Sequence, residues 1–285
     1  MKLTSLHKQL GFEEGSISNI KEYSSNFDIK MLSLVINCDK HKERLRAFEK
    51  TAKEAKLKFY RNICVNGAEY SSKLIYNAYM KKLVKNTSFI NPIEVSISVS
   101  HINCWLKILN SPYDYGFICE DDIIFRPNII KNINLILNTL KEEKKDFDIL
   151  YLWNGNWNST KSSLKKVLTI NKDLIIKQET RNFTAGTVSY IISRSMIEKL
   201  FKKVFPIKDP IDIFIGEFYN KAKIYTVYTK YDKKLKKDKS PLFKPGDWDN
   251  KILDDDDDED TQTTQDYNSL TIKGHINKYK KLINK

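Results

Sequence analysis

The chain has 285 residues, 41% of them hydrophobic, and is therefore long enough to bury one substantial core. Its 49 basic and 36 acidic residues give a net charge of +13, but the lysines are spread along the chain and define no nucleic-acid-binding face. No apolar run reaches the roughly 18 residues of a membrane-spanning helix, and the first residues lack the apolar stretch of a secretory signal. We therefore expect a globular cytoplasmic protein with no specific nucleic-acid partner.

The four cysteines are interpreted as small buried apolar side chains. Each lies in or beside an apolar stretch, where a thiol behaves as a hydrophobic group. The sequence has no C-x-x-C pair and no H-E-x-x-H helix, so nothing in it supports a zinc site. We expect thiols rather than a disulfide at Cys38, Cys64, Cys104 and Cys119.

Strands and helices alternate through the middle of the chain. The apolar strand MLSLVIN begins at Met31, a helical pattern covers 45–55, and a second strand leads to an Asn-Gly turn at 66–67. A helix over 95–109 then precedes the strand YGFIC, and further strands and helices follow up to the strand KIYTVYT. This alternation is typical of an open α/β sheet whose strands are mostly parallel.

The two ends of the chain are expected to lie outside this sheet. Residues 1–30 are polar and fit either an extra helix or a loose arm. Residues 251–265 include the run DDDDDED, which repels itself and predicts a disordered linker or loop. Residues 266–285 are basic and predict an amphipathic helix that docks on the body, on a partner or on a membrane surface.

Three consecutive acids, Glu120, Asp121 and Asp122, directly follow the strand YGFIC. Ligands of open α/β sheets bind at the carboxyl ends of strands, and hard divalent cations prefer carboxylate oxygens. The first and third acids project to the same side, about 7 Å apart along the backbone. The triplet fits a metal site or a solvated acidic turn, and nucleases and phosphatases also place paired acids at strand ends.

Five sequence blocks, in order, resemble glycosyltransferase family 25, which contains lipopolysaccharide and collagen galactosyltransferases. They are LVINCDKHKERL, VNGAE, IEVSISVSHINCWLKILN with SPYDYGFICEDDIIF, GTVSYIISRSMIEKL, and PIDIF, within residues 31–216. The resemblance implies a GT-A-like domain over residues 31–250 that uses Mn²⁺ or Mg²⁺. It implies transfer of galactose or glucose from a UDP-sugar with inversion. A bacterial or viral member fits best, which if viral would act in the host cytoplasm.

The resemblance also assigns roles to individual residues. Glu120 and Asp122 would hold the metal. The donor would be bound by Asn37, Arg44, Gly67, Glu94, Ser100, His101 and Asp121. Alternatives remain for three of these residues: a surface ion pair for Arg44, a helix N-terminal acid for Glu94 and a core histidine for His101.

The acceptor side is defined mainly by Asp212 in the Pro-Ile-Asp block. An inverting displacement needs a base on the face opposite the leaving diphosphate, and Asp212 is our candidate, with Glu217 as the substitute. The competing interpretation of Asp212 is an N-cap for the following helix. The acceptor would be a hydroxyl of a glycan, a lipopolysaccharide or a protein. The later segment SPLFKPGDWDNK matches no family motif securely.

Two other functions remain open on the sequence. The same acids would serve a metal-dependent phosphodiesterase or nuclease, and the chain would also fit a non-catalytic, carbohydrate-binding relative. Metal-stimulated hydrolysis of a UDP-sugar favours the transferase, DNA cleavage favours the nuclease, and sugar binding without turnover favours the binding protein.

Overall fold

The computed structural model describes residues 4–13, 27–152, 164–171, 174–179, 186–229, 242–245 and 270–284. The helical elements are α1 (Ser5–Gln9), α2 (Lys42–Glu54), η1 (Gly67–Glu69), α3 (Ser72–Met80), α4 (Pro92–Leu109), α5 (Ile129–Glu142), α6 (Arg194–Phe201), α7 (Ile211–Gly216) and α9 (Ile272–Ile283). The strands are β1 (Met31–Asn37), β2 (Tyr60–Ile63), β3 (Tyr115–Glu120), β4 (Ile123–Phe125), β5 (Ile149–Tyr151), β6 (Leu164–Thr169), β7 (Leu174–Glu179), β8 (Ser189–Ser193), β9 (Ile224–Thr229) and β10 (Phe243–Pro245).

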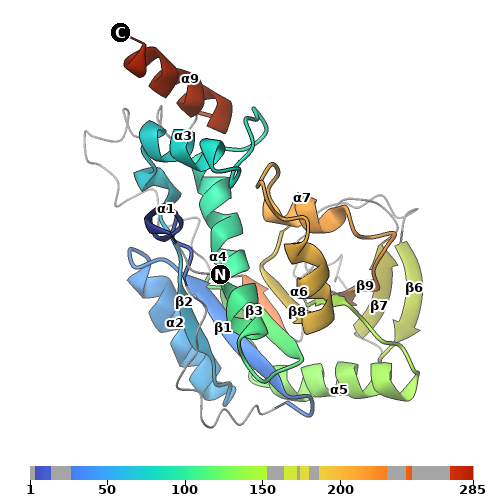
Figure 1. The fold of residues 1–285 in the computed structure, drawn as a ribbon. Helices are drawn as coiled ribbons and strands as arrows, with labels where there is room; N and C mark the ends of the chain where they lie inside the picture. Colours follow the sequence, from blue (N-terminus) through green and yellow to red (C-terminus); the bar gives the residue numbers. More distant parts are fainter. Residues whose placement is uncertain are drawn as a thin grey trace, which may run out of the picture.

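One eight-stranded sheet organises the fold, in the order β2-β1-β3-β8-β5-β9-β7-β6 (Figure 1). Strands β2, β1, β3, β5, β9 and β6 run in one direction, whereas β8 and β7 run in the other. The antiparallel β8 therefore begins beside the carboxyl end of β3. A separate two-stranded pairing joins β4 to β10.

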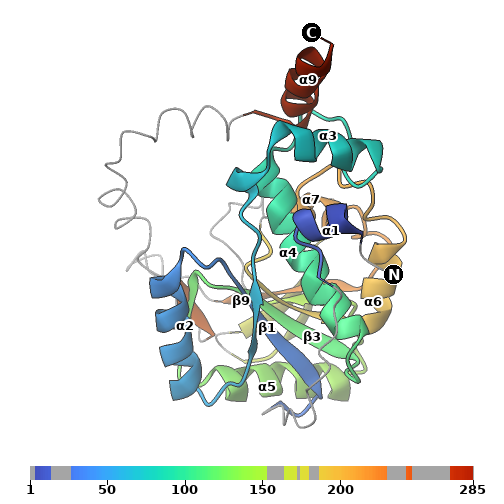
Figure 2. The same ribbon diagram turned by 60° about the vertical axis from the view of Figure 1, so that its left-hand side comes forward.

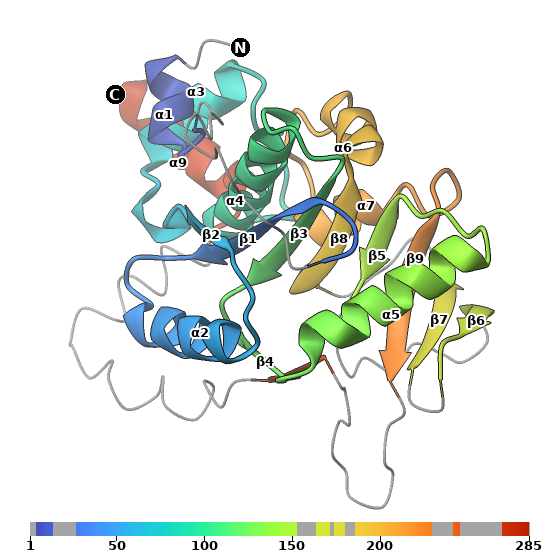
Figure 3. The ribbon, with the colours of Figure 1, turned by 90° about the horizontal axis from the view of Figure 1, so that it is seen from below.

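Helices cover both faces of the sheet, because alternate residues of its buried strands point to opposite sides. On β1, Leu32 and Leu34 pack with the helices α3, α4, α6 and α7, whereas Met31 and Val35 pack with α2 and α5. Figure 3 shows α2 and α5 together on one side of the sheet and α4 on the other. The result is a three-layer α/β core, and the expected fold class is confirmed.

The described ends of the chain pack beside α3 and α4 (Figure 2). Leu6 and Leu10 of the α1 region are buried in the main core. The basic C-terminal helix α9 rests on α3, with Ile272 and Ile276 buried and the Tyr279 ring 5.1 Å from that of Tyr76. No helix in the described part of the chain is long and apolar enough to span a membrane. The predicted acidic linker at 251–265 lies outside the described residues.

The prediction of thiols is wrong for one pair of cysteines. Cys38 and Cys64 form a disulfide, with their Cα atoms 4.6 Å apart. They directly follow the last paired residues of β1 and β2, Asn37 and Ile63, so strand pairing brings them together. Cys104 and Cys119 are buried thiols, as expected.

Arg194 joins the end of α4 to the start of α6. Its guanidinium donates hydrogen bonds to the carbonyls of Leu109 (2.7 Å), Ile108 (2.8 Å) and Tyr113 (2.7 Å), and to that of Ser111. The last carbonyls of a helix have no partner within the helix, so this single cation satisfies several of them. Arg194 thereby fixes α4 against the sheet.

We expect Arg194→Met to lower the free energy of unfolding by about 3 kcal/mol, because buried carbonyls lose charged donors. The matched control is Lys199→Met on the same helix, since Lys199 forms an exposed ion pair with Asp148 and should cost less than about 1 kcal/mol. Urea unfolding followed by circular dichroism measures both. Equal losses in the two variants would contradict the role given to Arg194.

Candidate active site

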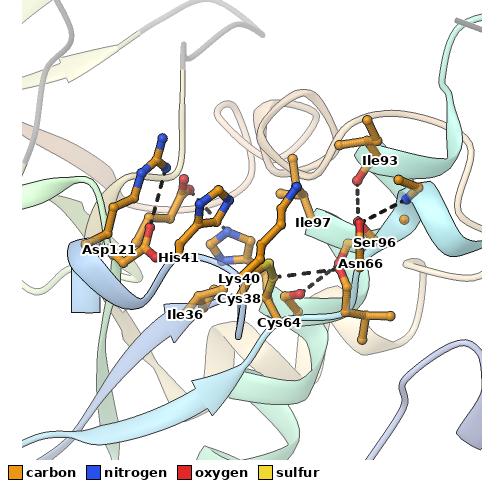
Figure 4. Close-up of a pocket in the computed structure, with 17 residues that line it drawn as sticks. Ile36, Cys38, Lys40, His41, Cys64, Asn66, Ile93, Ser96, Ile97 and Asp121 are labelled. Atoms are coloured by element: carbon orange, nitrogen blue, oxygen red, sulfur yellow. Dashed lines mark hydrogen bonds and ion pairs between the residues drawn. A yellow bond between two sulfur atoms is a disulfide. The ribbon is translucent and has the colours of Figure 1, made fainter. Parts of the chain in front are cut away.

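A pocket of about 280 Å³ opens where β1, β2 and β3 end (Figure 4). Its lining comes from the β1–α2 loop with the first turn of α2, from the β2–η1 loop with η1, from the first half of α4, and from two of the three acids, Glu120 and Asp121, at the end of β3. Figure 4 shows Asp121 and His41 on one side and Asn66 and Ser96 on the other. The lining residues are Ile36, Cys38, Lys40, His41, Arg44, Cys64, Val65, Asn66, Gly67, Ala68, Ile93, Ser96, Ile97, Ser100, His101, Glu120 and Asp121.

Asn37 and Asp121 meet because β1 pairs with β3 in parallel, with Ile36 opposite Glu120. The buried Asn37 amide donates to the Asp121 carboxylate and to the His41 carbonyl (3.1 Å). Its oxygen accepts a bond of 2.9 Å from the Arg61 side chain. Asn37 therefore lies behind the pocket and orients Asp121 within it.

Arg44 lies on the opposite side of the same acid. Its guanidinium is 3.8 Å from the Asp121 carboxylate, and its side chain is partly exposed. Lys40 and His41 precede it in the β1–α2 loop and also line the pocket. Lys40 in this loop and Arg44 in the first turn of α2 give the pocket a positive side close to the acids, as recognition of an anion requires, whereas burial and the Arg44 charge lower the pKa of His41.

Glu120 is held by two buried neighbours. Thr187 donates to its carboxylate over 3.0 Å, and the His101 Nε2 atom lies 3.4 Å from the same oxygen. Thr187 reaches this place because the antiparallel β8 starts beside the end of β3, where the Glu120 N–H also donates to the Val188 carbonyl.

The three acids differ in their electrostatics. Burial raises the pKa of Glu120, but its contacts with His101, Thr187 and Arg44 outweigh it and hold the pKa below its ordinary value. Burial raises the pKa of Asp121 despite the Asn37 bond and the Arg44 charge. Burial, followed by the charges of Glu120 and Asp121, raises the pKa of Asp122 to about 7. Asp122 is thus the acid that gains most from a nearby cation.

The side-chain atoms that could bind a divalent cation here form only part of a complete metal site. Within the described ranges, no three His, Cys, Asp or Glu side chains converge as a complete ion site. Mg²⁺ and similar ions, however, are commonly held by one or two carboxylates together with substrate phosphates. Glu120 lines the pocket and Asp122 follows two residues later without lining it, so the two carboxylates fit a cation whose coordination a bound diphosphate would complete.

The other predicted donor-binding residues differ in position. Ser100 and His101 line the pocket from α4, and Gly67 lines it from η1. Glu94 is outside the lining: its carboxylate accepts from the Asn91 N–H (2.7 Å) in a capping box at the start of α4. These contacts correspond to the alternative interpretation of Glu94 as an acid at the N-terminus of the helix.

The candidate base Asp212 lies in the first turn of α7, whose N-cap position is Pro210. One oxygen of Asp212 accepts from the Ile213 N–H (2.8 Å), and the other accepts from the Gly186 N–H (3.1 Å). Gly186 precedes Thr187, which contacts Glu120, so this short segment connects Asp212 with the acids, although Asp212 does not line the pocket. Because Pro210 occupies the N-cap position, the alternative interpretation of Asp212 as the N-cap residue is wrong.

Glu217 is the C-cap residue of α7 and does not line the pocket. Its carboxylate forms an exposed ion pair of 2.7 Å with Lys208. Of the two candidate bases, Asp212 is the one linked to the acids of β3.

Several site residues were not identified from the sequence. Lys40 and His41 follow β1 directly, a position that could have singled them out. Thr187 carries no such signal, because its contact with Glu120 depends on β8 running antiparallel to β3.

Comparison with known proteins identifies the family of this chain. The model of glycosyltransferase family 25, described as lipopolysaccharide biosynthesis proteins, matches residues 31–215. No curated protein matches the chain. Among solved structures, residues 1–349 of TarS from S. aureus are similar at 11% identity with a TM-score of 0.37; the match covers 76% of this chain and 60% of that one. That likeness is too remote to bear on function.

The match over residues 31–215 is to a family of glycosyltransferases. The chain belongs to glycosyltransferase family 25, as its sequence blocks predicted.

Gly67 allows η1 to approach α4 closely. A Cβ atom at this position would lie 2.3 Å from the Pro92 carbonyl oxygen and 2.7 Å from the Ile93 Cα. Both are backbone atoms, so the loop itself would have to move.

We expect Gly67→Ala to lower the free energy of unfolding by about 1–3 kcal/mol through this overpacking. The control is Gly274→Ala in α9, where the nearest atom is the end of the Leu270 side chain at 3.1 Å. Thermal unfolding compares the two proteins. A Gly67→Ala protein as stable as the Gly274→Ala protein would show that the close approach is unnecessary.

Proposed function

We propose that the chain transfers galactose or glucose from a UDP-sugar to a hydroxyl group of a glycan, a lipopolysaccharide or a protein, with inversion at the anomeric carbon. The observation that carries the proposal is the pocket itself, which Lys40 and Arg44 line together with Glu120 and Asp121 at the end of β3. Such a site suits a donor with a diphosphate and a bound cation.

Within this proposal, each side of the pocket has its own task. Lys40 and Arg44 bind phosphate oxygens, and the Asn66–Ala68 turn borders the nucleoside. Asp122 and Glu120 hold Mn²⁺ or Mg²⁺, which supplies charge stabilisation to the departing diphosphate when bound.

The chemical step is a displacement in which Asp212 takes the proton. The acceptor oxygen bonds to the anomeric carbon while the bond from that carbon to the diphosphate oxygen breaks. UDP leaves with the electron pair, and the acceptor's proton moves to the Asp212 carboxylate. The two N–H bonds that Asp212 accepts fix the direction of its remaining lone pairs.

The C-terminal helix supports a membrane contact as part of the proposal. Its exposed distal half carries Lys278, Lys280 and Lys281 beside the exposed Leu282 and Ile283. Basic and apolar groups together favour an anionic lipid surface.

A cytoplasmic location is also proposed, with one observation against it. Disulfides persist mainly in oxidising compartments, whereas Cys38 and Cys64 are bonded. In a reducing cytoplasm the two would stand side by side as thiols.

Asp122→Asn tests the metal assignment directly. We expect a loss of roughly a hundredfold or more in cation-dependent hydrolysis of UDP-galactose or UDP-glucose, because an electrostatic contact to the transition state disappears. Asp146→Asn is the control, since Asp146 is exposed in an ion pair with Lys223. Near-normal turnover by Asp122→Asn would refute the assignment.

The same variant has a second expected effect on the metal-free protein. Because folding raises the pKa of Asp122 from 3.8 to about 7, its acid form stabilises the fold below pH 3.8, and this stabilisation is lost as the pH rises through about 7. Asparagine stays neutral, so in a chelator at about pH 8 Asp122→Asn should melt above the wild type. Calorimetry measures the difference, and a lower melting temperature would contradict the pKa assignment.

Asp212→Asn tests the base. We expect transfer to an acceptor to fall by roughly a hundredfold or more, with UDP affinity little changed. The controls are Asp209→Asn on the neighbouring loop and Glu217→Gln, the substitute base. If Asp212→Asn transfers sugar at the wild-type rate while Glu217→Gln does not, the roles of the two acids are exchanged.

A further inference from the structure

A chain of buried hydrogen bonds runs from the core to the site. The indole N–H of Trp105 donates to the Tyr190 hydroxyl (3.1 Å), which lies 2.9 Å from His101 Nδ1. His101 Nε2 is 3.1 Å from the Thr187 hydroxyl, and that hydroxyl donates to Glu120 over 3.0 Å. Trp105, Tyr190 and His101 are all fully buried.

The groups at the two ends of this series of hydrogen bonds fix the direction of the bonds that they make. An indole N–H can only donate, and an ionised carboxylate can only accept. Tyr190 accepts from Trp105, so its own proton is available for His101 Nδ1. Thr187 donates to Glu120, so its oxygen is available to accept from His101 Nε2. All protons therefore point from the core toward Glu120.

This direction requires one form of the His101 ring. Nδ1 carries the lone pair and Nε2 carries the proton. The opposite tautomer would direct the Nδ1 proton at an oxygen that already accepts from Trp105, and would set the Nε2 lone pair beside the Glu120 carboxylate at 3.4 Å. His101 Nδ1, at 2.9 Å, is an acceptor within reach of the Tyr190 proton.

We propose that Tyr190, supported by Trp105, is a positioning residue that fixes the tautomer of His101 and thereby the orientation of the Glu120 carboxylate. His101 is then no donor-binding residue, although it lines the pocket, because both of its ring nitrogens are engaged by the protein. The tautomer follows from the hydrogen bonds alone. Its consequence for turnover rests on the proposed function.

Orientation matters at Glu120 because a carboxylate that must rotate before it binds a cation or a donor loses part of its interaction energy. Partners behind a metal-binding group are worth roughly 10- to 100-fold in affinity or activity. A series of hydrogen bonds that begins on the helix α4 and ends on the strand β3 keeps the Glu120 carboxylate in place before the ligand arrives.

The test is ¹⁵N NMR of the metal-free protein labelled at histidine. The chain has four histidines, and the His101 signals are assigned by their loss in His101→Gln. We expect the wild type to show a protonated Nε2 and an unprotonated Nδ1, and Tyr190→Phe to shift the ring toward the other tautomer or a mixture. A wild-type His101 protonated at Nδ1, or a tautomer unchanged in Tyr190→Phe, overturns the proposal.

Turnover of the UDP-sugar provides the second readout. Tyr190→Phe should lose roughly 10- to 100-fold in kcat, with a smaller change in KM. His101→Gln should retain more activity than His101→Leu, because a glutamine can accept from Tyr190 and donate toward Thr187. Equal activity of the Gln and Leu variants counts against a positioning role.

Tyr70→Phe controls for the loss of a buried hydroxyl. Tyr70 donates to the Leu10 carbonyl (2.7 Å), so this variant should lose stability while leaving the His101 tautomer unchanged. The NMR measurement tests the hydrogen-bond chain, and the turnover measurement also tests the proposed function. A wild type without sugar-nucleotide turnover but with the expected tautomer shift refutes the proposed function and leaves the hydrogen-bond chain intact.

Discussion

The parallel pairing of β1 with β3 is the constraint on which the site depends. Because Ile36 lies opposite Glu120, the next residue of each strand, Asn37 and Asp121, project at the same edge of the sheet. One step of register would move every side chain to the other face. The pairing of β1 with β2 then brings Cys38 beside Cys64. A few strand contacts thus define the floor of the pocket.

The antiparallel direction of β8 brings contacts to the site that a fully parallel sheet would not provide. It starts where β3 ends, so Thr187 meets Glu120 and Gly186 meets Asp212. Two acids that are far apart in sequence are thereby connected through adjacent backbone positions. The helix α4, fixed at its far end by Arg194, brings His101 to the same point. Sheet direction and one helix therefore assemble the acidic side of the site.

Sequence reasoning predicted the features that short patterns encode. Apolar strands beginning at Met31 and Tyr115, the helix of α4 and the acids after β3 have clear local signals, and the ordered blocks identified the family. The capping box of Asn91 and Glu94 was also readable, since both residues stand at the required spacing. Glu94 fitted both a helix N-terminal role and a donor-binding role, and the local sequence pattern could not decide between them.

Features that depend on distant contacts were not predictable in the same way. Strands β6 and β7, with the sequences LKKVLT and LIIKQE, mix charged or polar residues with apolar ones and show no strict alternation. They form because they pair with each other and with β9. The disulfide joins positions 26 residues apart, and the bond of Tyr190 to His101 joins positions 89 apart. None of these follows from local periodicity.

The central claim is that these acids serve sugar transfer rather than phosphodiester cleavage, which similar acids also catalyse. The most direct measurement is release of UDP when the purified chain is incubated with a panel of UDP-sugars, with and without Mn²⁺, alongside a single-stranded and a duplex DNA substrate. The account predicts cation-dependent release of UDP from UDP-galactose or UDP-glucose and no DNA cleavage. Cation-dependent DNA cleavage without release of UDP from any UDP-sugar would contradict it.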